Sequence, residues 1–397
     1  MRHVIVGGGV AGITAAMELA RRGGDEVVVF SDEPHPYYYR PQLTEFLAGH
    51  TTMERLVRRP LEWYAGRGMT LRLSTSVTRI DVDAHEVTTA AGETVPYDRL
   101  LLAMGSLPFV PPIHGADKEG VRTWRTLEDT LILEQVASSC QQVAVLGGGL
   151  LGLEAARGLR GYCHHVTVVE VFPRLMPRQL DEEGAGLLQT FVTSLGIDVI
   201  LGARCEAFEG GARVSGIKLG DGRTLPAQTV VVAAGVRANA TLAEAAGIRC
   251  DRGIVVDDRM ATSAPDVYAA GDVAVFRGYS WAIAPIAQAQ GRIVASNMAG
   301  DDARYDVVIP STTLKVVGID VSSVGLVNPE AGEAQELRVL DAAAGTYKKI
   351  VVQDGVIVGS IIINDPRLAK ALEAKIAGRE QMTADEAQRL IGVGDPT

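Results

Sequence analysis

Short apolar runs alternate with helix-like patterns along the first third of the chain. Val4 to Val6 has the pattern of a buried strand, and apolar positions recur at helical spacing from about Ala11 to Arg22. The pair Gly23-Gly24 ends that helix, and the run from Val27 to Phe30 predicts the next strand. The segment therefore predicts a strand, a helix and a parallel strand.

The same order of elements recurs after residue 140, which indicates a duplicated domain. Residues 143–146 predict a strand, a helix pattern begins at Leu151, and Val166 to Val169 predict the following strand. In each copy a further buried strand runs into a glycine, from Leu100 to Ala103 before Met104-Gly105 and from Val230 to Ala233 before Ala234-Gly235. Each copy therefore predicts one parallel sheet.

The remaining segments are assigned from weaker patterns. Residues 31–60 are irregular, a helix is expected around 53–66, runs at 71–80 and 85–90 predict a small β-meander, and a strand at 266–269 leads into Gly271-Asp272. From Tyr305 onward we expect strands at 312–317, 322–326, 337–340, 348–352 and 356–363, and helices at 366–377 and 383–391. The predicted class is α/β, with two Rossmann-like three-layer domains (1–112 with 240–304, and 113–239) plus a C-terminal α+β domain (305–397).

Both copies carry the sequence G-x-G-x-x-G directly after the first strand. In such a motif the first glycine allows a tight turn, the second lets the backbone approach a pyrophosphate, and the third lets the helix lie close to the strand. The helix N-terminus offers N–H groups and a positive dipole end to phosphates. Two copies predict two dinucleotides and electron transfer between them. The glycines are Gly7, Gly9 and Gly12, and then Gly147, Gly149 and Gly152.

Acidic residues after the second strand of each copy indicate which nucleotide binds. Glu170 directly follows Val169, where a carboxylate accepts hydrogen bonds from ribose hydroxyls and repels a 2′-phosphate, which favours NADH over NADPH. Arg174 could still support NADPH. In the first copy Ser31 stands at the matching position, and the ribose contact is displaced to Glu33, with Asp32 as the alternative.

Composition and charge exclude several classes of protein. The 397 residues are 47% hydrophobic and 22% charged, which is typical of two or three folded domains, and the net charge of −10 argues against nucleic acid as a partner. No apolar run is long enough to cross a membrane, and the chain enters its first strand directly after Met1, so we expect no signal peptide and a cytoplasmic location. No metal site is expected, since the adjacent His164 and His165 are a weak signal and the cysteines have no paired spacing; they are Cys140, Cys163, Cys205 and Cys250.

Several further segments share a pattern with one known family. They are Asp32-Glu33-Pro34, Tyr37 to Glu45, Ala103 to Pro108, Glu170 to Pro177, Ala270-Gly271-Asp272 and Thr313 to Val316. With them, the chain resembles the FAD-dependent pyridine nucleotide-disulfide oxidoreductase superfamily over nearly its full length. Within it, the chain is most similar to NADH:rubredoxin reductases and to the FAD-binding portion of assimilatory nitrite reductases.

The resemblance assigns FAD to the first domain and NADH to the second. Asp272 would bind the ribityl chain, and Met104 replaces the small threonine usual in the family. The implied FAD residues are Gly7, Gly9, Ala11, Gly12, Asp32, Glu33, Arg40, Pro41, Val77, Ala103, Met104, Gly105, Gly271 and Asp272. The implied NADH residues are Gly147, Gly149, Leu150, Leu151, Gly152, Glu154, Glu170, Arg174 and Gly235.

The resemblance also shows what this chain lacks. Larger members pass electrons through a C-x-x-x-x-C disulfide, and peroxidase- or oxidase-type members keep one cysteine, but the segment from Tyr37 to Gly49 contains none. Thiol chemistry is therefore disfavoured, and electrons would leave FAD directly for a one-electron carrier. Glu45 and Glu154 would tune or orient the cofactors rather than transfer protons, or would be an ordinary loop acid and an ordinary helix acid.

The expected acceptor is a small redox protein of the rubredoxin or ferredoxin type, or a partner reductase subunit. Docking of such an acidic carrier could involve Arg58 and Arg59, within a cluster that also contains Arg55 and Arg67, although a solubilising surface is the simpler interpretation. A homodimer through the C-terminal domain is possible by resemblance. The alternatives are an electron-input subunit of a larger nitrite reductase, a cysteine-independent NADH oxidase, and a non-catalytic FAD-binding redox sensor or scaffold.

Overall fold

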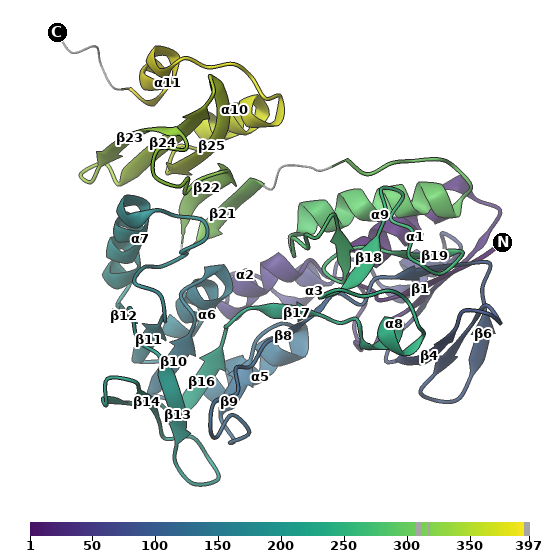
Figure 1. The fold of residues 1–397 in the computed structure, drawn as a ribbon. Coiled ribbons are helices and arrows are strands. Elements are labelled where there is room, and N and C mark those ends of the chain that lie inside the picture. Colours follow the sequence, from purple (N-terminus) through teal and green to yellow (C-terminus); the bar gives the residue numbers. More distant parts are fainter. Residues whose placement is uncertain (307–310, 317, 393–397) are drawn as a thin grey trace. The chain divides into compact units, whose positions relative to one another are not determined.

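The computed structural model describes residues 1–306, 311–316 and 318–392 of the chain (Figure 1). The chain divides into two compact units. The first unit is made of Met1–Leu43, Thr51–Pro108 and Val236–Val307. The second unit is made of Thr44–His50, Phe109–Gly235 and Val308–Thr397.

A parallel five-stranded sheet forms the centre of the first unit. Its order is β19-β7-β1-β2-β3, and Val4 in the middle strand is in register with Val28 and Leu100. Helix α1 (Val10–Arg22) lies so close to α9 (Ala284–Met298) that a Cβ on Gly291 would come within 2.6 Å of the Ala11 carbonyl oxygen. The strands are β1 (Arg2–Val6), β2 (Glu26–Phe30), β3 (Met69–Arg72), β7 (Arg99–Leu102) and β19 (Val267–Ala269).

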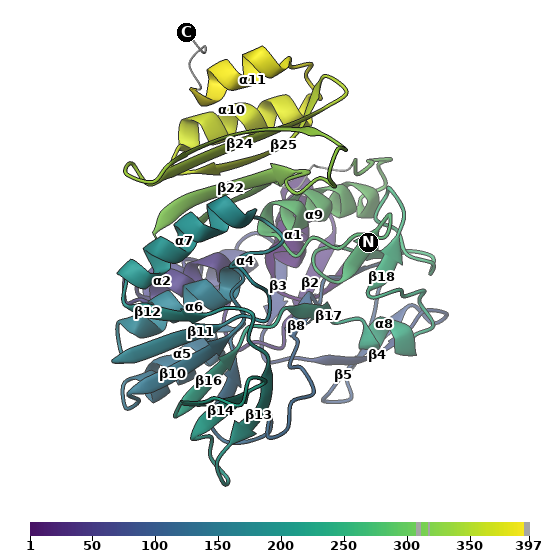
Figure 2. The same cartoon turned by 60° about the vertical axis from the view of Figure 1, so that its left-hand side comes forward.

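Smaller elements complete the first unit (Figures 1 and 2). The meander is β4 (Val77–Asp81), β5 (Glu86–Thr89) and β6 (Thr94–Pro96), and two further strand pairs are β8 (Ser106–Pro108) with β17 (Val236–Ala238) and β18 (Ile254–Val256) with β20 (Ala274–Phe276). The short helices are η1 (Arg40–Gln42), α2 (Leu43–Leu47, which continues into the second unit), α3 (Met53–Leu56), α4 (Leu61–Ala65) and α8 (Thr241–Ala245).

Two predictions for this unit are wrong in detail. The single helix expected at 53–66 is two short helices, α3 and α4, separated at Pro60, which caps α4 and has no N–H with which to continue the earlier helix. The residues at the start of the expected meander, Leu71 and Arg72, belong to β3 of the parallel sheet, where Leu71 pairs with Val29.

The second unit repeats the same architecture around another parallel sheet, of order β12-β11-β10-β16-β9. Its edge strand β9 precedes the glycine motif in sequence. The corresponding edge strand of the first unit, β19, is the last strand of its sheet in sequence. The elements are β9 (Val121–Thr123), β10 (Gln142–Leu146), β11 (His165–Val169), β12 (Ile197–Ile200), β16 (Thr229–Val232), α5 (Leu127–Ala137), α6 (Leu150–Arg160) and α7 (Glu182–Ser194), with a small sheet of β13 (Cys205–Glu209), β14 (Gly216–Leu219) and β15 (Thr224–Pro226).

The C-terminal part of the second unit is an antiparallel sheet of order β21-β22-β25-β24-β23. One face carries Ile350, Val352 and Ile362, which form a core with the two last helices. Val317, the end of the strand expected at 312–317, lies outside the described residues. The elements are β21 (Ser311–Val316), β22 (Ile319–Gly325), β23 (Gln335–Asp341), β24 (Thr346–Gln353), β25 (Val356–Ile363), α10 (Pro366–Ala377) and α11 (Ala384–Ile391).

This architecture confirms the predicted α/β class with two Rossmann-like sheets and a C-terminal α+β part. Among the helices of the described residues, none has the length and apolar composition that crossing a membrane requires.

Gly158 is the point where α6 meets α2 within the second unit. A Cβ at this position would lie 2.7 Å from the Leu47 Cγ, whereas no atom outside the neighbouring residues lies within 4 Å of a Cβ on Gly186 in α7. We therefore predict that replacing glycine with alanine changes the stability of the protein in opposite directions at these two positions. Gly186→Ala should stabilise the protein by roughly 0.5–1 kcal/mol through helix propensity. Gly158→Ala should destabilise it by about 1–3 kcal/mol through overpacking.

Urea unfolding followed by far-UV circular dichroism measures both changes. If Gly158→Ala is as stable as Gly186→Ala, then the contact between α2 and α6 is not tight.

Candidate dinucleotide-binding sites

The predicted site residues of each unit gather at the carboxyl edge of its parallel sheet, because parallel strands all end at the same edge. In the first unit Gly7 follows β1, Ala103 follows β7 and Gly271 follows β19 after one residue. In the second unit Gly147 follows β10 and Glu170 follows β11. Open α/β sheets bind their ligands at this edge.

The glycine turns of the two units have the same geometry. Gly7 has φ +116° and Gly147 has φ +120°, which only glycine adopts without strain, and each N–H donates to a carbonyl at the end of the second strand, Phe30 at 2.8 Å and Val169 at 2.9 Å. A Cβ on Gly12 would lie 2.0 Å from the Gly7 carbonyl oxygen, and one on Gly152 would lie 1.9 Å from that of Gly147. Only glycine therefore fits at the third position of each motif, because any side chain would overlap this carbonyl oxygen.

The middle glycines behave differently, because no atom beyond their chain neighbours lies within 4 Å of a Cβ built on Gly9 or Gly149. Both residues are extended N-caps, of α1 and α6, without a side-chain cap. The first backbone N–H groups of each helix are therefore not capped by the side chain of the N-cap residue. The space in front of both middle glycines fits a pyrophosphate, which needs close backbone approach and free donors.

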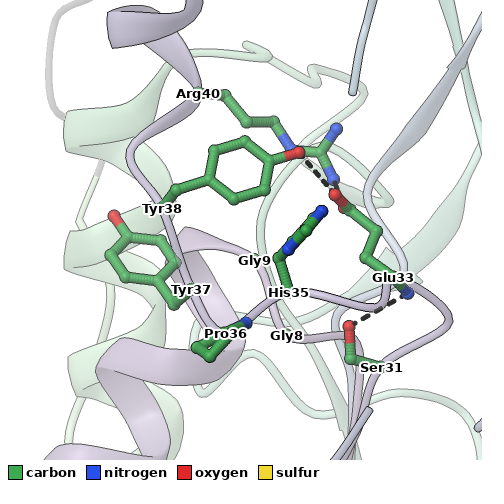
Figure 3. A pocket seen from close by; sticks show the side chains of 9 residues that line it. All are labelled: Gly8, Gly9, Ser31, Glu33, His35, Pro36, Tyr37, Tyr38 and Arg40. Atoms are coloured by element: carbon green, nitrogen blue, oxygen red, sulfur yellow. Dashed lines mark hydrogen bonds and ion pairs between the residues drawn. The ribbon is translucent and has the colours of Figure 1, made fainter. Parts of the chain in front are cut away.

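Glu33 lines a pocket beside the first glycine turn (Figure 3). Its carboxylate, 16% exposed, accepts hydrogen bonds from the Tyr38 hydroxyl and, at 2.5 Å, from the Arg40 guanidinium. Burial raises the pKa of the neighbouring Tyr37 to about 12, so its phenol is neutral at pH 7. The lining residues are Gly8, Gly9, Ser31, Glu33, His35, Pro36, Tyr37, Tyr38 and Arg40. Asp32 is exposed and is not among them, which favours Glu33 for a ribose contact.

Ser31 and Glu170 occupy equivalent positions in the two units. A Cβ on Gly8 would lie 3.0 Å from the Ser31 hydroxyl, and one on Gly148 would lie 3.0 Å from the Glu170 Cβ. The Ser31 hydroxyl accepts a hydrogen bond of 3.3 Å from the Glu33 N–H. The Glu170 carboxylate accepts from the N–H groups of Gly148 (2.6 Å) and Phe172 (2.8 Å). Each carboxylate oxygen keeps further acceptor capacity for a ribose hydroxyl.

The other residues implied for FAD lie on several elements of the first unit. The Ala103 N–H donates to Val6 at 2.7 Å, and the Asp272 carboxylate accepts from the Ser106 hydroxyl at 2.7 Å, a contact that sequence reasoning missed. Ala11 is buried on α1 beside Gly271. The remaining residues are the half-buried Met104 and the positive-φ Gly105 after β7, the exposed Pro41 in η1, and Val77 at the start of β4.

The residues implied for NADH lie around α6 and β11. Leu150 and the 37% exposed Leu151 begin α6, and Glu154 is buried in that helix. Gly235 follows β16 and accepts from the Phe109 N–H at 2.9 Å. The Arg174 guanidinium donates to the carbonyls of Leu180 (3.2 Å) and Pro177 (3.3 Å), so two of its donors already bind the loop itself. This weakens the case for Arg174 as a 2′-phosphate ligand.

Glu45 has protein partners within the second unit. Its carboxylate, 46% exposed, pairs with the His50 imidazole at 2.9 Å and with Arg157 of α6 at 3.4 Å. These contacts attach the segment after Leu43 to α6. The part of Glu45 in tuning a flavin stays a prediction.

All four cysteines are free, and three of them are buried. Cys140 and Cys163 share a hydrogen bond, which together with burial raises the pKa of Cys163, and burial raises the pKa of Cys205 to about 11. The sequence spacing did not suggest that Cys140 and Cys163 are neighbours, because α6 and its flanking turns separate them. No group of three or more His, Cys, Asp or Glu side chains in the described residues could hold a metal ion.

The arginine cluster lies on and around α3 and α4 of the first unit. The guanidinium groups of Arg59 and Arg67 stack over the Trp63 ring, 4.3 and 3.9 Å from its centroid. Arg55 and Arg58 are exposed. Two arginines of the cluster therefore stack on Trp63, and the other two, Arg55 and Arg58, face the solvent.

Comparison with known proteins shows which family has this arrangement. Residues 1–291 match the pyridine nucleotide-disulphide oxidoreductase family, and residues 310–380 match the rubredoxin NAD+ reductase C-terminal domain. This chain belongs to the pyridine nucleotide-disulphide oxidoreductase family. The predicted family is confirmed, and with it the predicted cofactors, FAD and NADH.

Three similar proteins illustrate the range of relatives. A nitrite reductase [NAD(P)H] of Bacillus subtilis is 38% identical over 91% of this chain and 45% of its own length. The ferredoxin–NAD(+) reductase component of the biphenyl dioxygenase system of Paraburkholderia xenovorans is 30% identical over 97% and 95% of the two chains. The reductase in a covalent putidaredoxin reductase–putidaredoxin complex superimposes with a TM-score of 0.89 at 27% identity, over 100% and 99%. The chain spans less than half the length of the nitrite reductase.

The open middle glycines provide a test of each site. Alanine can adopt the extended backbone of Gly9 (φ −78°) and Gly149 (φ −79°), and the protein leaves room for its methyl group. We expect both alanine variants to fold normally while the methyl group displaces a pyrophosphate. Gly9→Ala should lose FAD, and Gly149→Ala should keep FAD but bind NADH about tenfold or more weakly, a loss of at least ~1.4 kcal/mol.

The absorbance of bound flavin and titration with NADH measure these effects, and each variant serves as the control for the other. Unchanged flavin content in Gly9→Ala would show that the first turn does not contact the FAD pyrophosphate.

Proposed function

We propose that this protein takes electrons from NADH and passes them through FAD to a small one-electron carrier of the rubredoxin or ferredoxin type. The observation that carries the proposal is the pair of open glycine turns, one in each unit, in a chain whose segment from Tyr37 to Gly49 has no cysteine. The match of residues 310–380 to a rubredoxin reductase domain and the likeness to a reductase crystallised with its redox partner support it.

In this proposal the first unit holds FAD and the second holds NADH. We propose the domain limits 1–112 with 240–304, 113–239, and 305–397. Bound in the first unit, FAD would supply the chemistry that links a two-electron hydride donor, NADH, to a one-electron carrier. Gly7, Gly9 and Gly12 would hold its pyrophosphate, Glu33 the adenosine ribose, and Asp272, oriented by Ser106, the ribityl hydroxyls.

The chain's part in hydride transfer is orientation rather than proton transfer. Gly147, Gly149 and Gly152 would bind the NADH pyrophosphate and Glu170 the adenosine ribose. The buried Glu154, four residues after Leu150 at the start of α6, would lie toward the nicotinamide end of that site. Such alignment supplies most of what a protein adds to hydride transfer between two cofactors.

A second candidate is the electron-input part of a larger nitrite reductase. The observation that favours it is the 38% identity to a nitrite reductase of which this chain spans 45%. In that case the acceptor would be a metal-containing partner reductase subunit rather than a free carrier. Co-purification with a metalloprotein would distinguish this candidate from the free-standing reductase.

Three further expectations remain proposals. A homodimer through the C-terminal part is suggested by family resemblance, and a cytoplasmic location is suggested by the sequence. The exposed Arg55 and Arg58 would contribute to docking of an acidic carrier, since opposite charges steer association.

The central experiment is anaerobic reduction by NADH followed by rapid mixing with rubredoxin, ferredoxin and flavodoxin. We expect NADH to bleach the flavin absorbance, with no titratable redox thiol, and one of the carriers to restore it. Oxygen uptake that matches NADH use, with no stimulation by any carrier, would instead indicate an oxidase. Very slow flavin reduction at saturating NADH would indicate a non-catalytic sensor or scaffold.

Glu170 should determine the choice of nucleotide. Glu170→Gln removes the negative charge that repels a 2′-phosphate and weakens acceptance from ribose hydroxyls. We expect KM for NADH to rise about tenfold, which corresponds to ~1.4 kcal/mol, and KM for NADPH to fall. The matched control is Glu206→Gln on β13 of the same unit, where the carboxylate is exposed. Equal changes for the two nucleotides would contradict a ribose contact.

A further inference from the structure

The segment from Glu170 to Asp181, here called the ribose loop, connects β11 to α7 in the second unit. Its first residue holds Gly148, which lies between the first two glycines of the nucleotide motif, since the Glu170 carboxylate accepts from the Gly148 N–H at 2.6 Å. The Met176 N–H donates back to the Gly148 carbonyl at 3.0 Å. Leu175, Met176 and Leu180 are buried beneath the loop. The position of the loop and that of the glycine turn are therefore linked.

The last residue of the ribose loop is bound by the C-terminal sheet. Asp181 caps α7 by accepting from the Gly184 N–H at 3.0 Å. Its other carboxylate oxygen accepts from the Tyr347 hydroxyl at 2.6 Å and the Lys349 ammonium at 3.1 Å. Both donors lie on β24, on the face opposite Ile350 and Val352 of the sheet's own core. Two of the three groups that hold Asp181 thus come from the C-terminal part.

Asp181 and Lys349 are charged groups that are largely removed from water, so each depends on the exact positions of its partners. The Lys349 side chain is 2% exposed and lies between Asp181 and Glu336, 3.3 Å from the latter. Burial would raise the pKa of Asp181, but the hydrogen bonds from Tyr347, Gly184 and Lys349 outweigh it and hold the pKa below its ordinary value. Burial and the bond to Asp181 raise the pKa of Tyr347. The pair therefore exists as carboxylate and neutral phenol near pH 7.

The Tyr347 ring also lies close to the start of α7. A Cβ on Gly184, in the first turn of α7, would lie 3.2 Å from the Tyr347 ring, so the ring lies directly against the helix N-terminus. The Asn328 side chain adds a long hydrogen bond of 3.5 Å to the Leu180 carbonyl, which also accepts from Arg174. The C-terminal part thus touches the ribose loop at two successive residues.

We infer that the C-terminal part positions the NADH ribose loop, with Tyr347 and Lys349 as positioning residues that act through Asp181. The inference rests on the proposed NADH site. Glu170 and Asp181 are the two ends of one short loop, so a shift at Asp181 changes where the Glu170 carboxylate meets the ribose. Small displacements of positioning groups are costly because binding contacts depend steeply on distance.

The test uses Tyr347→Phe, which removes one hydrogen bond and keeps the ring against α7. We expect the dissociation constant for NADH to rise about tenfold, equivalent to ~1.4 kcal/mol, the scale of one hydrogen bond to a charged group. Reduced nicotinamide mononucleotide has no adenosine ribose, so its dissociation constant should not change. Flavin content and kcat at saturating NADH should also stay the same, and KM alone should rise.

Two matched controls separate positioning from general destabilisation. Tyr97→Phe makes the same change in the first unit, at a buried hydroxyl without a hydrogen-bond partner in the described residues. Lys348→Met, on the other face of β24, breaks a pair with Asp365 of 3.0 Å and serves as the control for Lys349→Met. Lys349→Met leaves the buried Asp181 carboxylate without its cation and can prevent folding, in which case Tyr347→Phe decides alone.

Each result decides between the alternatives. The inference is supported if only NADH binding weakens in Tyr347→Phe. It is overturned if Tyr347→Phe binds NADH as the wild type does, or if NADH and the mononucleotide weaken equally. If the wild-type protein with its FAD does not bind NADH at all, the proposed function itself has failed.

Discussion

The close approach between the third and first glycines of each motif is the contact on which both sites depend. Gly12 and Gly152 lie against the carbonyl groups of Gly7 and Gly147, where any Cβ would be about 2 Å from an oxygen. That contact fixes the direction in which α1 and α6 leave the sheet. Each helix therefore presents its N-terminus, uncapped by a side chain, at the carboxyl edge where parallel strands end.

From this shared turn, the two copies differ at the acid that follows the second strand. In the second copy Glu170 holds the glycine turn directly, with the Gly148 N–H as its donor. In the first copy Ser31 takes that place, and Glu33 lies farther along, fixed by Tyr38 and Arg40. The same fold thus places a carboxylate at two different positions after the second strand, directly after it in the second copy and two residues later than Ser31 in the first. This difference suits two different dinucleotides.

The residues of the segment after Tyr37 support the proposal that electrons leave through the flavin. The segment where larger relatives carry a redox disulfide has no cysteine here, and Glu45 in that segment pairs with Arg157 and His50. The C-terminal part takes on another task by holding Asp181 at the end of the ribose loop. In the proposed NADH site, residues of two sheets of one unit would therefore act together.

The sequence alone determined the duplicated units, the glycine turns, the strands and helices directly around them and those of the C-terminal part, because these depend on local periodicity and on residues a few positions apart. It did not predict the helices α5, α7, α8 and α9. It did not predict the three-residue strand β9, the break at Pro60, the neighbouring Cys140 and Cys163, or the bond between Ser106 and Asp272. Above all, it did not reveal that Tyr347 and Lys349 bind Asp181, since this contact joins residues 166 positions apart. Only the tertiary structure decided such contacts, because a buried Lys or Asp is stable only when it is paired, and these partners meet only once the two sheets have folded together.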